Sequence, residues 1–223
     1  MYNDPYLSPK TARKWPDFEP QGPILHELFA NPGDGSFCGF ALAQIAARTK
    51  PALLWVQEYR ALREAGRPFL HGMPAALRDS FIHVVTRDTK QALWAMEEGL
   101  KCPSLSAVIG EVHGDARALD FTATRRLAVA AERYGVSAFL VRIGGHADLS
   151  GARRRWRVAS RPSLTHPLDA QAPGRPAWSL DLFRARDLRP GSWNAAYDAA
   201  AHRLDLVPAT GDEPVVQGTS QAG

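Results

Sequence analysis

The feature that most constrains this chain is a glycine-rich turn between a strand-like run and a helix-like run. Residues 24–29 read Ile-Leu-His-Glu-Leu-Phe and predict a strand, and Gly39–Thr49 carries apolar side chains at helical spacing. The turn between them contains Gly33, Asp34, Gly35 and Ser36. A strand, a glycine turn and a helix in this order are typical of folds built on a parallel sheet.

The turn has the frame of a phosphate-binding loop without its binding groups. A working Walker A loop needs a Lys after its last glycine and then a Ser or Thr for Mg²⁺. Here Phe40 follows Gly39, and Ala41 stands in the hydroxyl position. At ~1.5–3 kcal/mol for each contact, the two losses cost about two to four orders of magnitude of nucleotide affinity. We therefore expect either a tight turn or a weak anion site, disfavoured by the charge of Asp34, and no bound cofactor.

The composition is that of an ordinary globular protein, with 45% apolar residues among 223 and a net charge of +4. No apolar run approaches the ~20 residues of a membrane span, and the first residues do not form a signal-peptide pattern. The two cysteines and seven histidines show no metal-ligand spacing. We expect a cytoplasmic protein with no metal and no membrane partner.

Strands and helices alternate up to about residue 150. This order predicts an α/β fold, a mainly parallel sheet with helices on both faces. The expected strands are 51–57, 81–85, 105–109 and 137–143, and the expected helices are 88–101 and 120–134, capped by Asp88 and Asp120. Further strands at 155–160, 177–184 and 202–207 predict an appended antiparallel, β-rich C-terminal part. We expect one domain, residues 23–207, between an N-terminal tail or strap (1–22) and a disordered C-terminal tail (208–223).

This order of elements resembles the RecA core. The resemblance places Glu58 where RecA-like ATPases carry the Glu that activates water, and Glu111 near the acidic position of Walker B. It places Arg142 in the position of the nucleotide-sensing Gln, and the loop 144–151, with His146, where RecA has a mobile DNA-binding loop. Because the Lys and the hydroxyl are missing, we interpret Glu58, in the position of the general base, and Glu111, in the Walker B position, as relics rather than as catalytic groups.

Several short phrases resemble the ImuA family more closely. They are 35–41, 125–132, 155–158, 173–178 and 189–193, and the resemblance covers about residues 23–207. It implies an accessory protein of SOS mutagenesis that works beside ImuB, an inactive relative of Y-family polymerases, and an error-prone replicative-type polymerase in translesion DNA synthesis. The family is non-enzymatic or at best a poor ATPase, which agrees with Phe40 and Ala41.

Arginines supply the remaining candidate contacts. Arg184 and Arg186 resemble the two basic residues with which a RecA protomer reaches its neighbour's ATP, so we expect either a contact with a RecA filament end or a solvated face. The run 153–157 mixes arginines with Trp156, as in single-strand binders, and alternation places Arg154 and Trp156 on one face. The candidates for contact with DNA or an acidic partner are Arg142, His146, Arg153, Arg154, Arg155 and Arg157; a plain basic surface is the alternative.

Two other function classes stay open. A cell-division inhibitor of the SulA type, which targets FtsZ, is also RecA-like without ATPase residues, but the Arg-rich part at about 150–207 favours the mutagenesis complex. An active RecA-like ATPase with an unusual loop is the second alternative. A hydrolase built on Ser36 is disfavoured, because the glycine positions of a nucleophile elbow hold Asp34 and Cys38.

Overall fold

The computed structural model describes residues 22–45, 52–169, 171–201 and 203–207. Both expected tails lie outside these residues, except for Gly22 at the end of the N-terminal tail (1–22); the C-terminal tail is 208–223. The end of the first predicted helix, 46–49, also lies outside them. No helix in the described ranges is long and apolar enough to cross a membrane.

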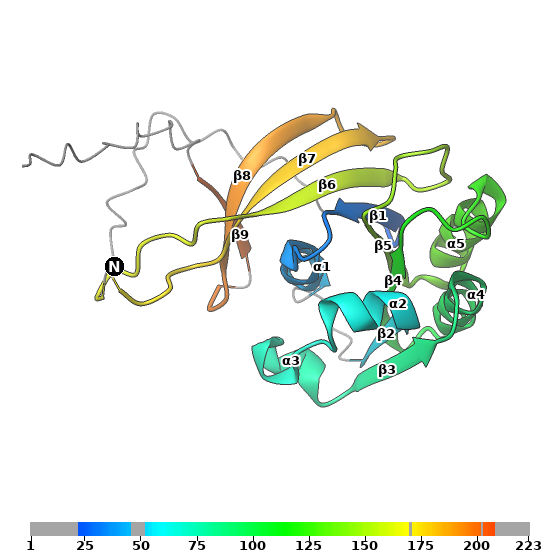
Figure 1. Cartoon of the computed structure of the whole chain (residues 1–223), viewed down its shortest axis with the longest axis horizontal. Coiled ribbons are helices and arrows are strands. Elements are labelled where there is room, and N and C mark those ends of the chain that lie inside the picture. Colours follow the sequence, from blue (N-terminus) through cyan, green and yellow to red (C-terminus); the bar gives the residue numbers. More distant parts are fainter. Residues whose placement is uncertain (1–21, 46–51, 170, 202, 208–223) are drawn as a thin grey trace, which may run out of the picture.

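The described strands form one mixed sheet in the order β3-β2-β4-β5-β1-β6-β7-β8-β9 (Figure 1). The first six strands in this order (β3, β2, β4, β5, β1 and β6) pair in parallel. From β6 onward, the strands β6, β7, β8 and β9 pair antiparallel. This confirms the predicted parallel core with an antiparallel C-terminal part. The bounds are β1 (Leu25–Ala30), β2 (Ala52–Glu58), β3 (Phe81–Thr86), β4 (Leu105–His113), β5 (Ser137–Ile143), β6 (Arg154–Arg161), β7 (Ala177–Ala185), β8 (Gly191–Asp198) and β9 (Arg203–Val207).

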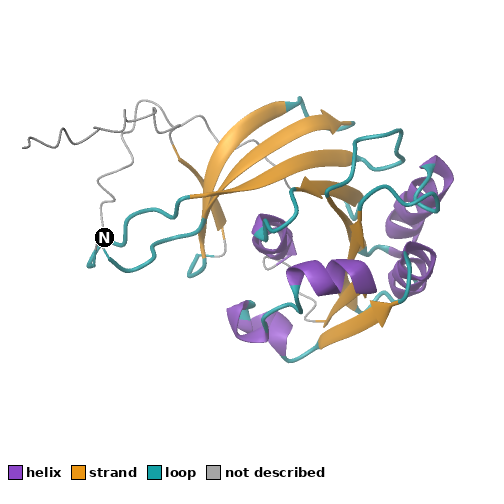
Figure 2. Cartoon of the chain, in the orientation of Figure 1, coloured by secondary structure: helices purple, strands orange, loops and turns teal. Residues whose placement is uncertain are grey.

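Helices cover both faces of the parallel part, as Figure 2 shows. The helices α1 and α2 pack on one face in a core that holds Phe40 and Trp156, and α4 and α5 pack on the other around Met96 and Leu127. The bounds are α1 (Ser36–Ile45), α2 (Tyr59–Ala65), the 3-10 helix η1 (Leu70–Gly72), α3 (Ala75–Arg78), α4 (Thr89–Leu100) and α5 (Phe121–Tyr134). The central strands are buried on both faces, which explains why they are nearly continuous apolar runs.

Local capping signals set the ends of the two outer helices. Asp88 accepts a hydrogen bond from the backbone N–H of Gln91 at 2.9 Å, and Asp120 accepts one from Ala123 at 2.8 Å. Gly135 ends α5 in the left-handed region, with φ of 71°. These three signals were readable in the sequence, and the structure confirms them.

The structure differs from the predicted elements at several places; the short helices α2, η1 and α3, for example, were not predicted. The first helix begins at Ser36 rather than Gly39, because the Asp34 carboxylate accepts a hydrogen bond from the Ser36 N–H at 2.8 Å and starts the helix one turn earlier. The stretch 191–198 was not predicted as a strand, yet it forms β8 between β7 and β9.

Candidate functional site

The glycine loop is closed by Asp34 rather than opened toward a phosphate. Besides Ser36, the Asp34 carboxylate accepts hydrogen bonds from the Ser160 N–H at 2.9 Å and the Ser160 hydroxyl at 2.6 Å. Burial works to raise the pKa of Asp34, but the hydrogen bonds from Ser160 and Ser36 outweigh it and hold the pKa below its ordinary value. An anion therefore already occupies the N-terminus of α1, where a phosphate would otherwise bind.

The residues in the Lys and hydroxyl positions belong to the core. Phe40 and Ala41 are both fully buried. The Phe40 ring meets Trp156 edge-on with centroids 5.2 Å apart, and meets Trp178 at 6.5 Å. Both side chains of these two positions are thus packing groups, and neither reaches the surface of the loop.

A pocket of about 340 Å³ lies beside the loop. Gly35, Gly39 and Ser160 line it, together with the stacked rings of Trp178 and Tyr197, whose centroids are 6.1 Å apart. Among the described residues that line this pocket, none carries a positive charge. A polyphosphate would find aromatic and small side chains here and the Asp34 carboxylate at the edge, which is an unfavourable environment for several negative charges.

The two carboxylates of the Walker B comparison lie on opposite faces of the sheet. Glu111 accepts hydrogen bonds from Trp55 Nε1 at 2.5 Å and Gln57 Nε2 at 2.8 Å, on the α1 face. Burial raises the pKa of Glu111 to about 7. Glu58 is one residue further along β2 than Gln57 and accepts a hydrogen bond from Thr89 of α4 at 3.0 Å.

Glu58 also accepts a hydrogen bond from the His113 N–H at 3.1 Å. Because Glu58 and Glu111 point away from each other, they cannot share one Mg²⁺ or one water molecule. No group of three or more His, Cys, Asp or Glu side chains in the described part of the chain is placed to hold a metal ion.

A buried charge cluster unites several of the candidate basic residues. Glu27 of β1 is fully buried and accepts hydrogen bonds from Arg155 Nε at 2.6 Å and from Arg142 Nη1 at 3.3 Å. Asp115 extends the cluster: it pairs with Arg142 at 2.5 Å and with the exposed His146 at 2.6 Å. The hydrogen bond between Asp115 and His146 lowers the pKa of the Asp115 carboxyl and raises the pKa of the His146 imidazole.

Arginine and phenylalanine side chains alternate across this face of the sheet. Phe29 lies under Arg142 and Arg155, each 5.3 Å from its ring centroid. Phe183 lies under Arg155 at 5.2 Å and Arg157 at 4.1 Å. The stack is buried at Arg142 and Arg155 and reaches solvent at Arg157, whose side chain is 57% exposed and pairs with Asp181 at 2.9 Å.

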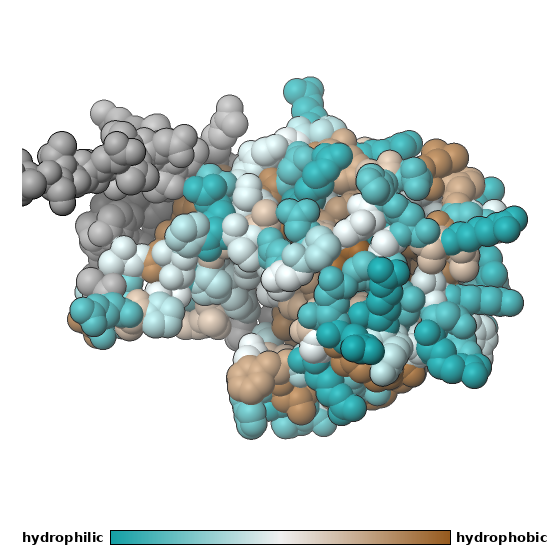
Figure 3. Space-filling model, viewed as in Figure 1, coloured by the Kyte–Doolittle hydropathy of each residue, from teal (hydrophilic) through white to brown (hydrophobic). Residues whose placement is uncertain are grey.

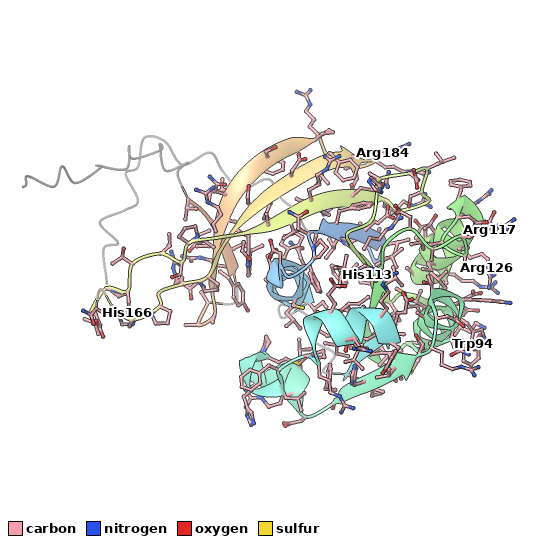
Figure 4. The ribbon with its side chains drawn as sticks, viewed as in Figure 1. Trp94, His113, Arg117, Arg126, His166 and Arg184 are labelled. Atoms are coloured by element: carbon pink, nitrogen blue, oxygen red, sulfur yellow. The ribbon has the colours of Figure 1, made fainter. Side chains whose placement is uncertain are left out.

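Of the other candidate arginines, two form ion pairs with carboxylates and two are exposed to solvent. Arg154 is buried on the opposite face and forms an ion pair with Asp187 at 2.6 Å, while Arg153 pairs with Glu132. Arg184 is exposed near the end of β7 (Figure 4), and Arg186, just beyond the strand, is exposed as well. Of the predicted contact residues, His146, Arg157, Arg184 and Arg186 therefore lie at the surface, and Arg142, Arg154 and Arg155 do not.

Sequence reasoning missed three residues that organise this region: the acidic Glu27 and Asp115, and Ser160, the partner of Asp34. Glu27 stands inside the apolar strand Leu25–Ala30, and a charged residue in such a run was the available signal. Asp115 and Ser160 carried no such signal, because their partners are 27 and 126 residues away in the chain.

No family model matches the chain. It is similar to Protein ImuA of Caulobacter vibrioides, in strain NA1000 / CB15N and in strain ATCC 19089 / CIP 103742 / CB 15, with 34% identity over 161 residues in each case. The similar region covers 68% of this chain and 62% of each relative, so it spans less than two thirds of their length.

Proposed function

Because the chain belongs to the ImuA family, we propose that it is a non-catalytic accessory protein of the SOS mutagenesis complex. In this role it bridges an ImuB-type inactive Y-family polymerase and the RecA filament or DNA during translesion synthesis, beside an error-prone replicative-type polymerase. It acts by protein–protein contact and turns over no nucleotide.

The observation that carries the non-catalytic part is the packing of the glycine loop. Phe40 is buried against two tryptophans in the position of the phosphate-binding Lys, and Asp34 holds the helix N-terminus. Glu58 and Glu111 are on different faces of the sheet and hold structural hydrogen bonds. Each group that an ATPase uses for binding or hydrolysis is thus replaced or engaged elsewhere.

The test is a titration of the purified chain with fluorescent ATP and Mg²⁺, with and without RecA filaments on single-stranded DNA. A parallel pull-down uses the ImuB-type protein. We expect no binding of ATP by the chain alone and stable capture of the polymerase-like protein. Tight ATP binding with turnover would show that the chain is an ATPase, and failure to capture the polymerase-like protein would overturn the bridging role.

For the RecA contact we propose Arg184 and Arg186. Both are exposed at one end of β7, and no carboxylate of the described residues forms an ion pair with either side chain. A protomer that lacks ATP can still present two arginines to ATP held by a RecA filament end, and so block further growth there. The variant Arg184→Glu with Arg186→Glu should lose filament binding, whereas Arg60→Glu with Arg63→Glu on α2 should keep it.

For DNA contact the surface candidates are His146 and Arg157, together with Arg184 and Arg186. Contacts between arginines and phosphates release counterions, so any DNA affinity should fall steeply with salt. A titration of single-stranded oligonucleotide at two salt concentrations measures this directly. Binding that is insensitive to salt would exclude the phosphate contacts.

A further inference from the structure

A groove between α4 and α5 has a charge pattern that the proposed function does not use. Its volume is about 290 Å³. Its lining includes Glu97 of α4, Lys101 directly after α4, and Arg125, Val129, Arg133 and Tyr134 of α5. Figure 4 shows Arg126 and Trp94 pointing outward on this side of the molecule. Figure 3 shows hydrophilic side chains at the edge of the molecule where α4 and α5 lie.

Three of these residues form one stripe along α5. Arg125, Val129 and Arg133 are spaced by four residues, so they lie on one face of the helix. At 1.5 Å per residue, the two arginines are separated by about 12 Å along the helix axis, with Val129 midway between them. Val129 is 48% exposed. The stripe therefore offers a cation, an apolar contact and a second cation in sequence.

The two arginines of the stripe are also the uncompensated cations of the groove. Glu97 forms an ion pair with Arg126, and Glu98 pairs with Lys101 at 2.6 Å. In the described ranges no carboxylate forms an ion pair with Arg125 or Arg133, and Arg133 instead lies over the Tyr134 ring at 5.5 Å. The groove thus keeps a net positive charge at two defined points.

We propose that this groove binds an acidic peptide segment of a partner protein, with two carboxylates flanking one apolar side chain. The carboxylates pair with Arg125 and Arg133, and the apolar side chain packs on Val129 and the alkyl stems of the arginines. Trp94, 63% exposed on α4, offers a further apolar surface next to the groove. Recognition of this kind combines an anchor with flanking charges, which set orientation and association rate.

The features of the groove favour a peptide over nucleic acid. A phosphate backbone would cover the exposed Val129 with charged groups, whereas a peptide can place an apolar side chain there. Two uncompensated arginines would also release few counterions, which gives weak nucleic-acid binding at physiological salt.

The test starts with random 12-residue peptides displayed on phage and selected on the purified full chain. We expect enrichment of sequences with Asp or Glu on both sides of one apolar residue. Fluorescence anisotropy of the most enriched peptide should weaken at least tenfold in Arg125→Glu with Arg133→Glu, and several-fold in Val129→Ser. The control Arg60→Glu with Arg63→Glu makes the same charge change on α2, at exposed sites on the other face of the sheet, and should stay within twofold.

Circular dichroism melting shows that each variant is folded before it is used. Enriched peptides without an acidic pattern, or an acidic peptide whose affinity is the same in the groove variants, would overturn the proposal. So would an oligo-dT strand that binds the chain and loses its affinity in the groove variants while no acidic peptide is enriched.

Discussion

The indole ring of Trp178 lies so close to Gly39 that a Cβ added at Gly39 would be 2.5 Å from Trp178 Cζ2. Trp178 is itself buried between Phe40 and Tyr197, so it cannot move aside easily. The last glycine of the loop thus serves the contact between α1 and the antiparallel strands, where a phosphate loop would use it for its ligand. This contact packs α1 directly against β7 of the antiparallel part.

The variant Gly39→Ala should therefore lower stability by ~1–3 kcal/mol, because the clash with Trp178 outweighs the better helix propensity of Ala. Gly35→Ala in the same loop is the matched control, since an added Cβ there meets nothing within 4 Å. Its effect should stay within about 0.5 kcal/mol. Urea denaturation of both variants measures the difference, and equal midpoints would contradict the packing role of Gly39.

Restoring the Walker Lys should not restore ATP binding. Phe40 is fully buried, so Phe40→Lys removes its packing on Trp156 and places a charge in the core. We expect a loss of ~3–5 kcal/mol in the free energy of unfolding and no measurable ATP affinity. Phe69→Lys is the control, because Phe69 is 72% exposed and should tolerate the change. A stable Phe40→Lys protein that binds ATP would show that the loop is only one residue short of function.

Glu111 should make the protein less stable as pH rises. Its pKa in the folded chain is about 7, above its ordinary value of 4.5, because the carboxyl group is buried. The folded state therefore holds the proton more tightly than the unfolded state. Below pH 4.5 the free energy of unfolding is not reduced by this group. It falls as the pH rises from 4.5, and at pH 7 the reduction reaches ~3 kcal/mol.

The variant Glu111→Gln should remove this pH dependence, because the amide does not ionise. Denaturation at pH 5, 6, 7 and 8 should give a smaller fall in stability for Glu111→Gln than for the parent chain. Glu98→Gln is the control, since Glu98 is half-exposed in its pair with Lys101. Parallel curves for all three proteins would mean that Glu111 is ionised in the folded state over this whole range.

The parts of the fold that the sequence predicted depend on local chemistry. Asp88, Asp120 and Gly135 cap their helices through contacts within a few residues, so their effect can be read from a short window. The buried parallel strands were readable as continuous apolar runs for the same reason. The parallel core with an antiparallel end followed from the order of these elements.

The parts that could not be predicted depend on distant partners, whereas two local signals were missed. In the strand β8, Trp193, Ala195 and Tyr197 alternate with the polar Ser192, Asn194 and Asp198, which is a readable strand pattern. The early start of α1 depends on the hydrogen bond from the Ser36 N–H to Asp34, a contact within two residues that was the second local signal missed. The burial of Arg155 depends on Glu27, 128 residues away. An arginine run in a sequence therefore does not distinguish a surface patch from a buried ion cluster.

The strongest effect of a single charge should come from Glu27, because it is the fully buried partner of both Arg142 and Arg155. The variant Glu27→Gln keeps the size of the side chain and leaves two buried guanidinium groups without their shared anion. We expect a loss of ~3–5 kcal/mol, measured by urea denaturation. Glu132→Gln, which breaks the partly exposed pair with Arg153, should cost ~0–1 kcal/mol. If Glu27→Gln costs no more than Glu132→Gln, Arg142 and Arg155 are hydrated in solution, and both become available again for contact with DNA.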